Sequence, residues 1–550
     1  MKKSEKSFRR KGLFLAAVMV LSAVAGGCGK NGDSGGTAAN NYEPYGKYES
    51  EVTLKAVKSI TSEKFVNGDD ISNNVWTRSY QDDLGIKVNY MWTVPESQYD
   101  QKMNITIASG DLPDIFAVSP KQYNQLIEAG KIADITQAYE KTATDRLKDV
   151  INSNPQADEY NRVDGKIMGL CGVASPYDAA DLIWLRTDWL KKLGLEPPKT
   201  MEELNHIIKA FANDDPDGDG NKNTYGLAMC KELVGGIGGI QGYLAGYHAY
   251  INMWYDNGNG ELIFGSIQPE MKTALLALQD LMKAGAIDPE FGVKDTNKIQ
   301  EDLGASKVGV SIGAMWQPNS GIKSVVELNK KADWYPYALV SIDDAPACTM
   351  VDSTPKSYTV VNKDYKYPEA YFKMLNLYAD RYLYPDTLEI YRTYAHGDGM
   401  EYFKYATFQI SLATKNVEAS RKIRNALATG DESQLDPNLK ENCEQLRQYD
   451  EVDKKSWSQM RISGENGAFH VIDDEYLKKD RLKLNAYYDN PTKTMTEKLA
   501  TLEKMQDEVF TKIILGEDIS SFDTFVEDWK RLGGEQITKE VNDWYKEKNK

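Results

Sequence analysis

The chain has 550 residues, of which 41% are hydrophobic and 27% are charged, a composition typical of globular proteins with large buried cores. Its 66 Lys and Arg against 82 Asp and Glu give a formal net charge of −16, which argues against binding nucleic acid or anionic lipid through bulk charge. A mean hydropathy of −0.54 excludes a protein with many membrane-spanning segments.

Residues 1–27 have the organisation of a signal peptide. Basic residues are followed by an apolar run from Leu13 to Ala25, which is shorter than the roughly 20 residues of a bilayer-spanning helix. The small residues before Cys28 resemble the lipobox of bacterial lipoproteins, which implies a diacylglyceryl anchor at Cys28. An ordinary leader cut near Ala25, with a free thiol at Cys28, is the alternative. We expect an extracytoplasmic protein, anchored by lipid to the outer face of the cell membrane.

Residues 28–47 predict a flexible tether, because they are rich in Gly, Asn and Ser and nearly free of aliphatic side chains. Strand-like and helix-like patterns then alternate, with strands expected over 52–57, 86–92 and 114–118 and helices over 72–84 and 98–108. This order predicts an α/β fold with a mainly parallel sheet. Ligands of such sheets bind beyond the carboxyl ends of the strands. Trp92, Ser119 and Lys121 are therefore candidate ligand-binding residues.

A second unit begins near Cys171. Thr200 and Glu203 form a capping box before an amphipathic segment, and Pro269 and Gly285 bracket another, so both segments predict helices. After residue 400 the sequence is charged and has helical patterns. Four cysteines besides Cys28 lack metal-ligand spacing, and both free thiols and a disulfide remain open for Cys171, Cys230, Cys348 and Cys443.

Residues 215–224 have the ligand spacing of an EF-hand loop. Oxygen-bearing side chains alternate along the segment and Gly turns the chain between them, which lets one loop wrap a hard cation. We therefore expect a structural Ca²⁺ held by Asp215, Asp217, Asp219, Asn221, Asn223 and Thr224. The twelfth position is Gly226 instead of Glu, and a turn without metal is the alternative.

The chain is rich in aromatic residues, with 10 Trp and 33 Tyr. Saccharide sites combine aromatic rings with planar polar groups. Trp254 follows a Gly-rich stretch, and Trp316 follows the apolar run 308–315, so both are candidates for stacking on a sugar. Core packing is the alternative for any single Trp.

Motifs for catalysis are weak. Gly309-Val-Ser311-Ile-Gly313 matches the GxSxG nucleophile elbow, but a segment with Pro and Gly follows where the elbow requires a helix. The four His residues form no metal-binding motif. No local pattern selects a pair of carboxylates for glycoside hydrolysis. We expect no enzymatic activity.

Several segments together resemble family 1 of the extracellular solute-binding proteins, the lipid-anchored receptors of carbohydrate ABC importers. The longest is Leu185-Arg-Thr-Asp-Trp-Leu-Lys-Lys-Leu-Gly-Leu-Glu-Pro-Pro, preceded by Asp164-Gly-Lys-Ile-Met-Gly. Residues 108–115, 268–291 and 532–534 are similar to the same family. The likeness is strongest to its calcium-containing branch, which includes alginate-oligosaccharide and LipO-type receptors.

The resemblance implies a type II periplasmic-binding-protein fold, in which a discontinuous chain forms two hinge-linked lobes. Lobe 1 would comprise residues 48–170, and lobe 2 would comprise residues 171–338 with the calcium loop. The chain would return to lobe 1 over 339–380. The helix-rich residues 381–550 would be shared between the lobes.

The resemblance also implies that an oligosaccharide binds between the lobes and passes to an ABC permease driven by a separate ATPase. Trp316 would stack on the sugar, Ser119 and Lys121 would lie in the cleft, and Tyr247 and Trp457 are further matching positions. We expect a monomer that binds no nucleic acid. A peptide receptor or sensor partner of the same fold, and a secreted glycoside hydrolase, are the alternatives.

Overall fold

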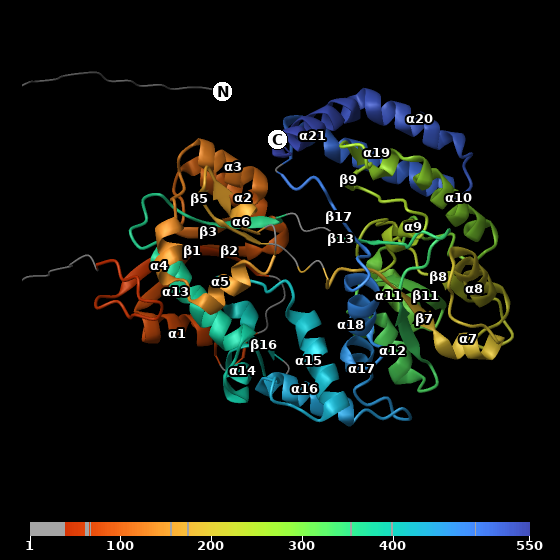
Figure 1. Cartoon of the computed structure of the whole chain (residues 1–550), viewed down its shortest axis with the longest axis horizontal. Helices are drawn as coiled ribbons and strands as arrows, with labels where there is room; N and C mark the ends of the chain where they lie inside the picture. The colour runs from red at the N-terminus through yellow and green to blue at the C-terminus, as the bar shows by residue number, and fades with distance from the viewer. Residues whose placement is uncertain are drawn as a thin grey trace, which may run out of the picture.

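The computed structural model describes residues 39–60, 65–66, 68–154, 157–172, 175, 177–351, 355–397, 400–489 and 491–549. The expected signal peptide, Cys28 and residues 29–38 of the expected tether lie outside these residues. Two α/β lobes lie side by side, and helices of the C-terminal third join them along one edge (Figure 1). Within the described ranges, the search for a helix long and apolar enough to cross a bilayer finds none.

Lobe 1 contains two small sheets. β1 (Val52–Ile60) pairs in parallel with β2 (Ile86–Pro95), and β14 (Ser357–Val361) lies antiparallel between β3 (Ile115–Val118) and β6 (Leu170–Gly172). Asp114 links the sheets: its carboxylate accepts the Lys55 backbone N–H at 2.7 Å, and its own N–H donates to the Lys55 carbonyl at 2.9 Å.

Helices cover these sheets of lobe 1. Asn74 begins α1, since its side chain accepts the backbone N–H groups of Trp76 and Thr77, and Gly85 ends the helix with a φ of 70°. The helices and remaining short elements of the lobe are α1 (Val75–Leu84), α2 (Glu96–Ser109), α3 (Pro120–Glu128), α4 (Thr136–Thr142), α5 (Asp145–Ile151), α6 (Ala157–Asn161), β4 (Arg162–Val163), β5 (Lys166–Ile167), α13 (Glu369–Tyr378), η3 (Ala379–Leu383), α14 (Leu388–Tyr394), β15 (His396–Gly397), β16 (Met400–Glu401) and η4 (Tyr402–Tyr405).

Lobe 2 is built on one four-stranded sheet. Its strand order is β12 (Trp334–Tyr337), β7 (Leu182–Arg186), β11 (Val308–Gly313) and β8 (Tyr225–Leu227). The other elements are α7 (Thr187–Leu193), α8 (Met201–Asn213), α9 (Gln241–Ala245), β9 (Trp254–Asp256), β10 (Leu262–Phe264), η1 (Gly265–Ile267), α10 (Pro269–Lys283), α11 (Thr296–Gly304), η2 (Gln317–Asn319), α12 (Gly321–Leu328) and β13 (Thr349–Val351).

The prediction of a mainly parallel sheet is wrong. The described strands pair in parallel at β1–β2, β8–β11 and β13–β17, whereas β14 and β7 are antiparallel to both of their neighbours. These two strands are the first after the chain changes lobe. Each enters its sheet from the edge that faces the other lobe, so it runs opposite to its neighbours. Strand–helix–strand order therefore predicts parallel strands only where the chain stays within one lobe.

The second change of lobe comes later than the expected residue 339. Leu339, Ala347 and Val351 are buried in the core of lobe 2, and β13 pairs there with β17 (Leu482–Leu484). The chain is next described at Pro355 and joins lobe 1 through β14. Because residues 339–351 keep contacts with lobe 2, the return segment is shorter than the resemblance implied.

The C-terminal part contacts both lobes. In α16 (Pro437–Arg447), Glu441 pairs with Arg392 of lobe 1 at 3.2 Å. In α15 (Lys415–Thr429), Arg421 and Arg424 pair with Asp473, which lies in lobe 2. The remaining elements pack on lobe 2: α17 (Trp457–Ser463), α18 (Ala468–Val471), η5 (Ile472–Leu477), α19 (Lys493–Ile514), α20 (Ser520–Trp529), η6 (Lys530–Gly534) and α21 (Glu535–Lys548).

Residues 39–47, expected to be part of a flexible tether, pack on α13 instead. The buried Glu369 carboxylate accepts the Asn40 side-chain amide and the Asn41 backbone N–H, both at 3.0 Å. The buried Lys373 ammonium donates to the carbonyls of Glu43 and Gly46. Composition alone predicts flexibility here. The contacts that order the segment use mainly its backbone groups, and their partners lie on a helix more than 300 residues away, so the local sequence does not reveal them.

Candidate functional site

The edges of the two sheets that face each other are marked by the crossing segments. In lobe 1, Gly172 at the end of β6 lies opposite Ser357 at the start of β14. In lobe 2, Leu182 at the start of β7 lies opposite Gly313 at the end of β11. The chain passes between the lobes at Gly172, Leu182 and Ser357, so both sheets present these edges to the interlobe space.

A cavity of about 540 Å³ opens at this edge of lobe 1. It lies at the ends of β1 and β3, against α2 and the segment 403–409, and is lined in part by Ser59, Ser119 and Ser357. Aromatic and acidic side chains complete the wall. These include Tyr99, Glu96, Asp100, Phe403 and Phe408. Rings beside hydroxyl and carboxylate groups fit a polyhydroxylated ligand.

Trp316 is the aromatic residue that lobe 2 presents at its facing edge. It follows β11 by three residues, and 38% of its surface is exposed, whereas most other tryptophans are buried. The next residue, Gln317, is fully buried against Gly313, which fixes the start of the turn. Trp316 is therefore not a core residue, and it stays a candidate for stacking on a sugar.

Polar contacts join the first crossing segment, between Gly172 and Leu182, to residues 413–416, where the chain leaves lobe 1 again and α15 begins. Asn416 donates its side-chain amide to Asp178 at 2.8 Å, and Ser175 donates its hydroxyl to the Ala413 carbonyl at 2.6 Å. Burial raises the pKa of Asp178 to about 6 and lowers the pKa of Lys415 to about 8. The Lys415 ammonium lies 3.9 Å from the ring centroid of Tyr382, so the crossing segments are held by partly desolvated groups.

The three candidates from lobe 1 have different positions. Ser119 lines the cavity and also caps α3, where its hydroxyl accepts the Gln122 N–H at 3.4 Å. Lys121 is exposed on α3 but does not line the cavity. Trp92 packs on Tyr99 and donates its indole N–H to Thr106 at 3.1 Å, so its ring faces α2 instead of the cavity.

Three aromatic candidates from other segments are buried inside lobe 2, and we withdraw them as ligand-binding residues. Tyr247 packs on Tyr243 and accepts an amide hydrogen of Asn205 at 2.8 Å. Trp254 packs on Phe264 with ring centroids 5.1 Å apart. Core contacts occupy both rings.

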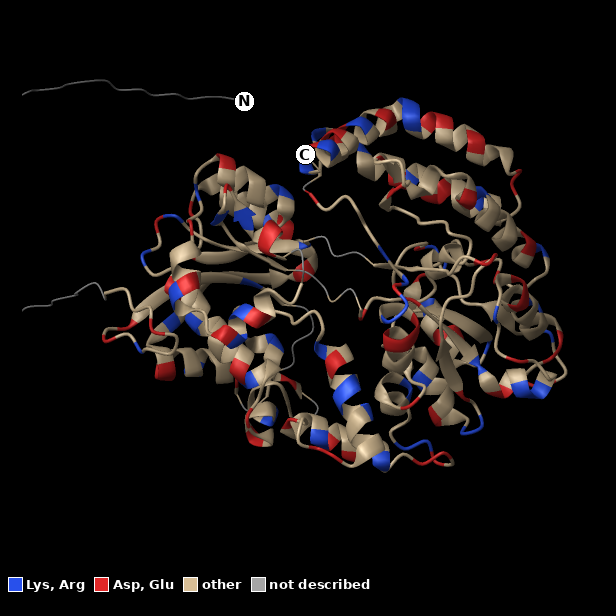
Figure 2. Cartoon of the chain, in the orientation of Figure 1, with Lys and Arg blue, Asp and Glu red and all other residues tan. Residues whose placement is uncertain are grey.

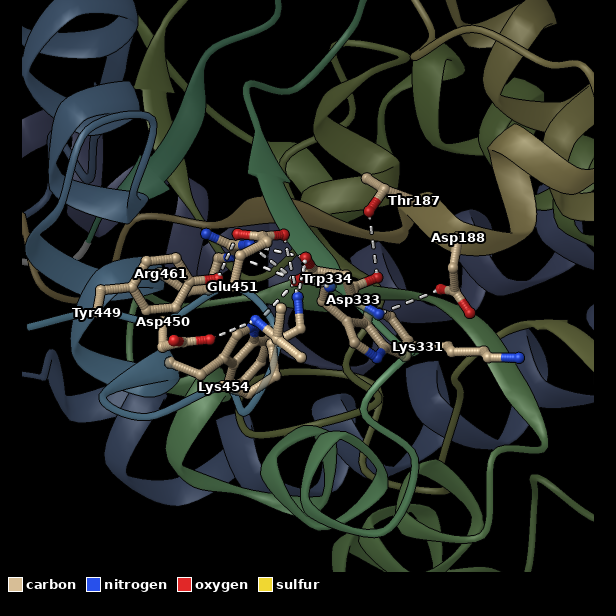
Figure 3. A network of polar contacts seen from close by, with 12 residues as sticks. Thr187, Asp188, Lys331, Asp333, Trp334, Tyr449, Asp450, Glu451, Lys454 and Arg461 are labelled. Carbon is tan, nitrogen blue, oxygen red and sulfur yellow. Dashed lines mark hydrogen bonds and ion pairs between the residues drawn. The ribbon is translucent and has the colours of Figure 1, made fainter.

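Trp457, the third, is only 3% exposed and donates its indole N–H to Asp333 at 2.8 Å. Asp333 also accepts a hydrogen bond from the Lys454 ammonium at 2.9 Å. Nη2 of Arg461 donates to both carboxylate oxygens of Asp333, at 2.8 and 2.9 Å, and Figure 3 shows Lys454 and Arg461 turned toward it. Trp457 therefore belongs to a buried polar network that ties α17 to β12.

The expected calcium loop brings its three carboxylates together. One oxygen from each of Asp215, Asp217 and Asp219 lies within 4.8 Å of the others. Backbone N–H groups of the loop orient them: Gly218 donates to Asp215 at 3.0 Å and Asn221 donates to Asp219 at 2.7 Å. Burial, followed by the charges of the other two carboxylates, raises the pKa of Asp217. A cation would relieve this repulsion, so the residues fit Ca²⁺.

The remaining loop candidates differ among themselves. Asn223 donates its amide to Asp219 at 2.8 Å, and Asn221 is exposed beside it. Thr224 is buried and donates its hydroxyl to the Phe211 carbonyl at 2.8 Å. Thr224 therefore joins the loop to α8, and its side chain is directed into the lobe.

The other sequence motifs have structural positions. Ser311 of the GxSxG match is fully buried within β11, where it cannot act as an exposed nucleophile. Cys171, Cys230, Cys348 and Cys443 are all free. Sequence reasoning missed Tyr99, Phe403 and Phe408, because α2 and the segment 403–409 are about 300 residues apart and neither contains a local motif.

Comparison with known proteins gives one family. A family model described as bacterial extracellular solute-binding protein matches residues 67–381. The Bacillus subtilis (strain 168) protein named lipoprotein LipO is 25% identical over 493 residues, which cover 84% of this chain and 86% of LipO.

Solved structures with the same fold include two saccharide-binding proteins. A solute-binding protein from Bifidobacterium longum infantis ATCC 15697, described as HMO binding, has a TM-score of 0.61 at 17% identity and covers 90% of this chain and 98% of its own. FusA of Streptococcus pneumoniae, in complex with kestose, has a TM-score of 0.57 at 18% identity, with 90% and 99% covered. A further FusA structure is described as an EF-hand mutant.

Proposed function

Because this chain belongs to the bacterial extracellular solute-binding proteins, we propose that it captures an oligosaccharide between its two lobes for an ABC importer. The observation that carries the proposal is the cavity at the interlobe edge of lobe 1, with an exposed Trp316 on the facing edge of lobe 2. The names of the relatives, HMO binding and a kestose complex, support a saccharide over a peptide.

In this mechanism the open protein binds the sugar against lobe 1, where carboxylate groups accept hydrogen bonds from the sugar and hydroxyl groups donate and accept them. Rotation about the crossing segments then brings Trp316 over the ring. Closure excludes water, which strengthens each polar contact. The ligand shifts the population toward the closed state by its higher affinity for that state. Permease subunits with their own ATPase would receive the closed complex.

Calorimetry of the chain beginning at residue 29, against a panel of oligosaccharides and short peptides, tests the proposal. We expect a saccharide to bind, and Trp316→Ala to weaken that binding by about 10- to 100-fold, the effect of losing one buried aromatic contact of about 1–3 kcal/mol. Leu328→Ala, which truncates an exposed apolar side chain elsewhere in lobe 2, is the matched control.

Two results would reject the assignment. Unchanged affinity in Trp316→Ala would remove that residue from the site, and a peptide as the bound ligand would favour the alternative receptor. Chromatography of the saccharide after long incubation with the protein tests the proposed lack of catalysis. We expect it to be recovered intact, and shortened products would indicate a glycoside hydrolase.

We also propose that Cys28 carries a lipid that anchors the protein at the outer face of the membrane. The lipobox-like sequence and the lipoprotein relative support this proposal. Incorporation of labelled palmitate into the wild type, and its loss in Cys28→Ser, is the expected result. Labelling that survives the substitution would contradict the anchor.

We further propose that the loop 215–224 holds a structural Ca²⁺. Asp215, Asp217 and Asp219 supply the carboxylates, and the description of FusA as having an EF-hand supports a cation in the same fold. Hard oxygen ligands of this kind suit calcium. The ion would connect the end of α8 to the start of β8 and would take no part in ligand binding.

A further inference from the structure

A second and larger hollow lies on lobe 1, outside the interlobe site. It has a volume of about 1180 Å³ and is lined by α1, α14 and α16, of which α14 contacts both of the others; the three lie toward the lower edge of lobe 1 in Figure 1. We call it the α16 groove. Its volume exceeds the roughly 300–1,000 Å³ typical of small-molecule sites and leaves room for several sugar units.

One face of α16 supplies a row of amides to the α16 groove. Asn438, Asn442 and Gln445 are spaced four and three residues apart, so they share one face of the helix and line the groove. None of the three side chains makes a hydrogen bond or ion pair with a described residue. Each amide offers both a donor and an acceptor in one plane, which matches the hydroxyl pairs of a sugar ring.

The opposite wall adds rings and fixed charges. Tyr391 and His396 line it with their ring centroids 5.7 Å apart. Arg392 crosses from α14 to pair with Glu441 of α16 at 3.2 Å, which holds the two walls together. Tyrosine beside planar amide, carboxylate and guanidinium groups is the side-chain set that a saccharide site requires.

The charges in the α16 groove indicate which saccharides fit. Four carboxylates line it but only two guanidinium groups, and burial lowers the pKa of His396, which disfavours its charged form. Figure 2 shows acidic and basic residues interspersed on α14 and α16. A ligand with carboxylates of its own would be repelled, whereas an uncharged sugar would not.

From this juxtaposition we propose that the α16 groove is a second binding site, for an uncharged oligosaccharide. It is separate from the interlobe site but near it. Met400, Glu401 and Tyr402 line the α16 groove, and the next residues, Phe403 and Lys404, line the interlobe cavity. The protein would thus hold two saccharides, or two parts of a long one, on the two sides of a single segment.

Native mass spectrometry and calorimetry of the chain beginning at residue 29 test the proposal. The probes are neutral tri- to pentasaccharides of the malto, cello and fructo series, tetragalacturonate and tetraalanine. We expect two bound neutral saccharides per chain. In the double variant Asn438→Ala, Asn442→Ala, the affinity of one of the two binding events should fall at least tenfold, and the affinity of the other should stay unchanged. Lys440→Ala, an exposed change on α16 outside the groove lining, should retain both.

Trp316→Ala separates this proposal from the interlobe site. It should weaken the event that the double variant retains and leave the α16 groove event unchanged. A single event in the wild type, or two events that both survive the double variant at its normal melting temperature, would overturn the second site without affecting the first. Tighter binding of tetragalacturonate or tetraalanine at the groove would overturn the assignment of an uncharged sugar.

Discussion

Asp333 is the buried carboxylate on which the contact between β12 and α17 depends. Its two oxygens accept hydrogen bonds from Lys454, Trp457 and Arg461, and Arg461 also stacks on Tyr335 with its guanidinium 3.6 Å from the ring centroid. Burial alone would raise the pKa of Asp333, but the charge of Arg461 and these hydrogen bonds hold it below its usual value.

We predict that Asp333→Ala lowers the free energy of unfolding by about 3–5 kcal/mol, because it leaves the buried Arg461 without its counter-charge and Lys454 with only the exposed Glu451. Asp343→Ala is the control, since its contact with His248 at 3.0 Å lies at the surface and should change the stability far less. Urea unfolding at pH 7 measures both. Similar losses for the two variants would show that the Asp333 network does not stabilise lobe 2.

The same network has a defined pH dependence. The folded-state pKa of Asp333 lies below the value of an unfolded chain, about 3.9. Its stabilisation is therefore fully present above about pH 4 and is lost as the pH falls through the folded pKa. The difference between wild type and Asp333→Ala should shrink in that acidic range only.

Single aromatic residues show where sequence reasoning stops. Trp316 was a candidate because it follows the apolar run 308–315 and because the family resemblance implies a sugar-stacking ring there, and the structure leaves it 38% exposed after the buried strand β11. Trp457 has no such local signal. Its partner Asp333 is 124 residues away, and only the tertiary fold brings a carboxylate to the indole N–H.

Local elements could be read from the sequence with small errors at their ends. The capping pattern at Thr200 predicts α8, and the Asp and Gly spacing predicts how the loop 215–224 gathers its carboxylates, because both depend on neighbours within a few residues. The direction of β7 and β14 was missed, since it depends on where the chain re-enters a lobe. The packing of residues 39–47 on α13 was missed because its partners lie more than 300 residues away.

The calcium loop provides a prediction for a single element. Added Ca²⁺ at a hundredfold excess over its Kd should stabilise the protein by about 2.7 kcal/mol, and a chelator should reverse the gain. Thermal unfolding with Ca²⁺ and with EDTA measures the effect. Asp217→Asn with Asp219→Asn should abolish it, and Asp364→Asn, an exposed change in lobe 1, should preserve it.

An unchanged melting temperature in Ca²⁺, or an equal gain in the double variant and the control, would exclude the loop as the binding site. The saccharide affinity of the calcium-free protein is a second readout. Because the loop follows α8 and does not line the interlobe cavity, we expect that affinity to change little while the protein stays folded.

At the scale of the whole molecule, the interlobe cavity in this arrangement is lined by lobe 1 and by the segment 403–409, and Trp316 is absent from its lining. In this arrangement, therefore, the facing edge of lobe 2 does not contribute side chains to the cavity wall. The two-lobe fold followed from the family resemblance, whereas the rings that line the cavity did not, because packing brings together segments from three distant parts of the chain, within residues 57–119, 356–359 and 403–409.

The most direct test is a crystal structure of the protein with the saccharide that binds most tightly in calorimetry. We expect the sugar to lie between the lobes and to touch both Tyr99 or Phe403 on lobe 1 and the ring of Trp316 on lobe 2. A sugar in the interlobe cavity that contacts one lobe only, or that leaves Trp316 exposed in a closed protein, would contradict capture between the two lobes.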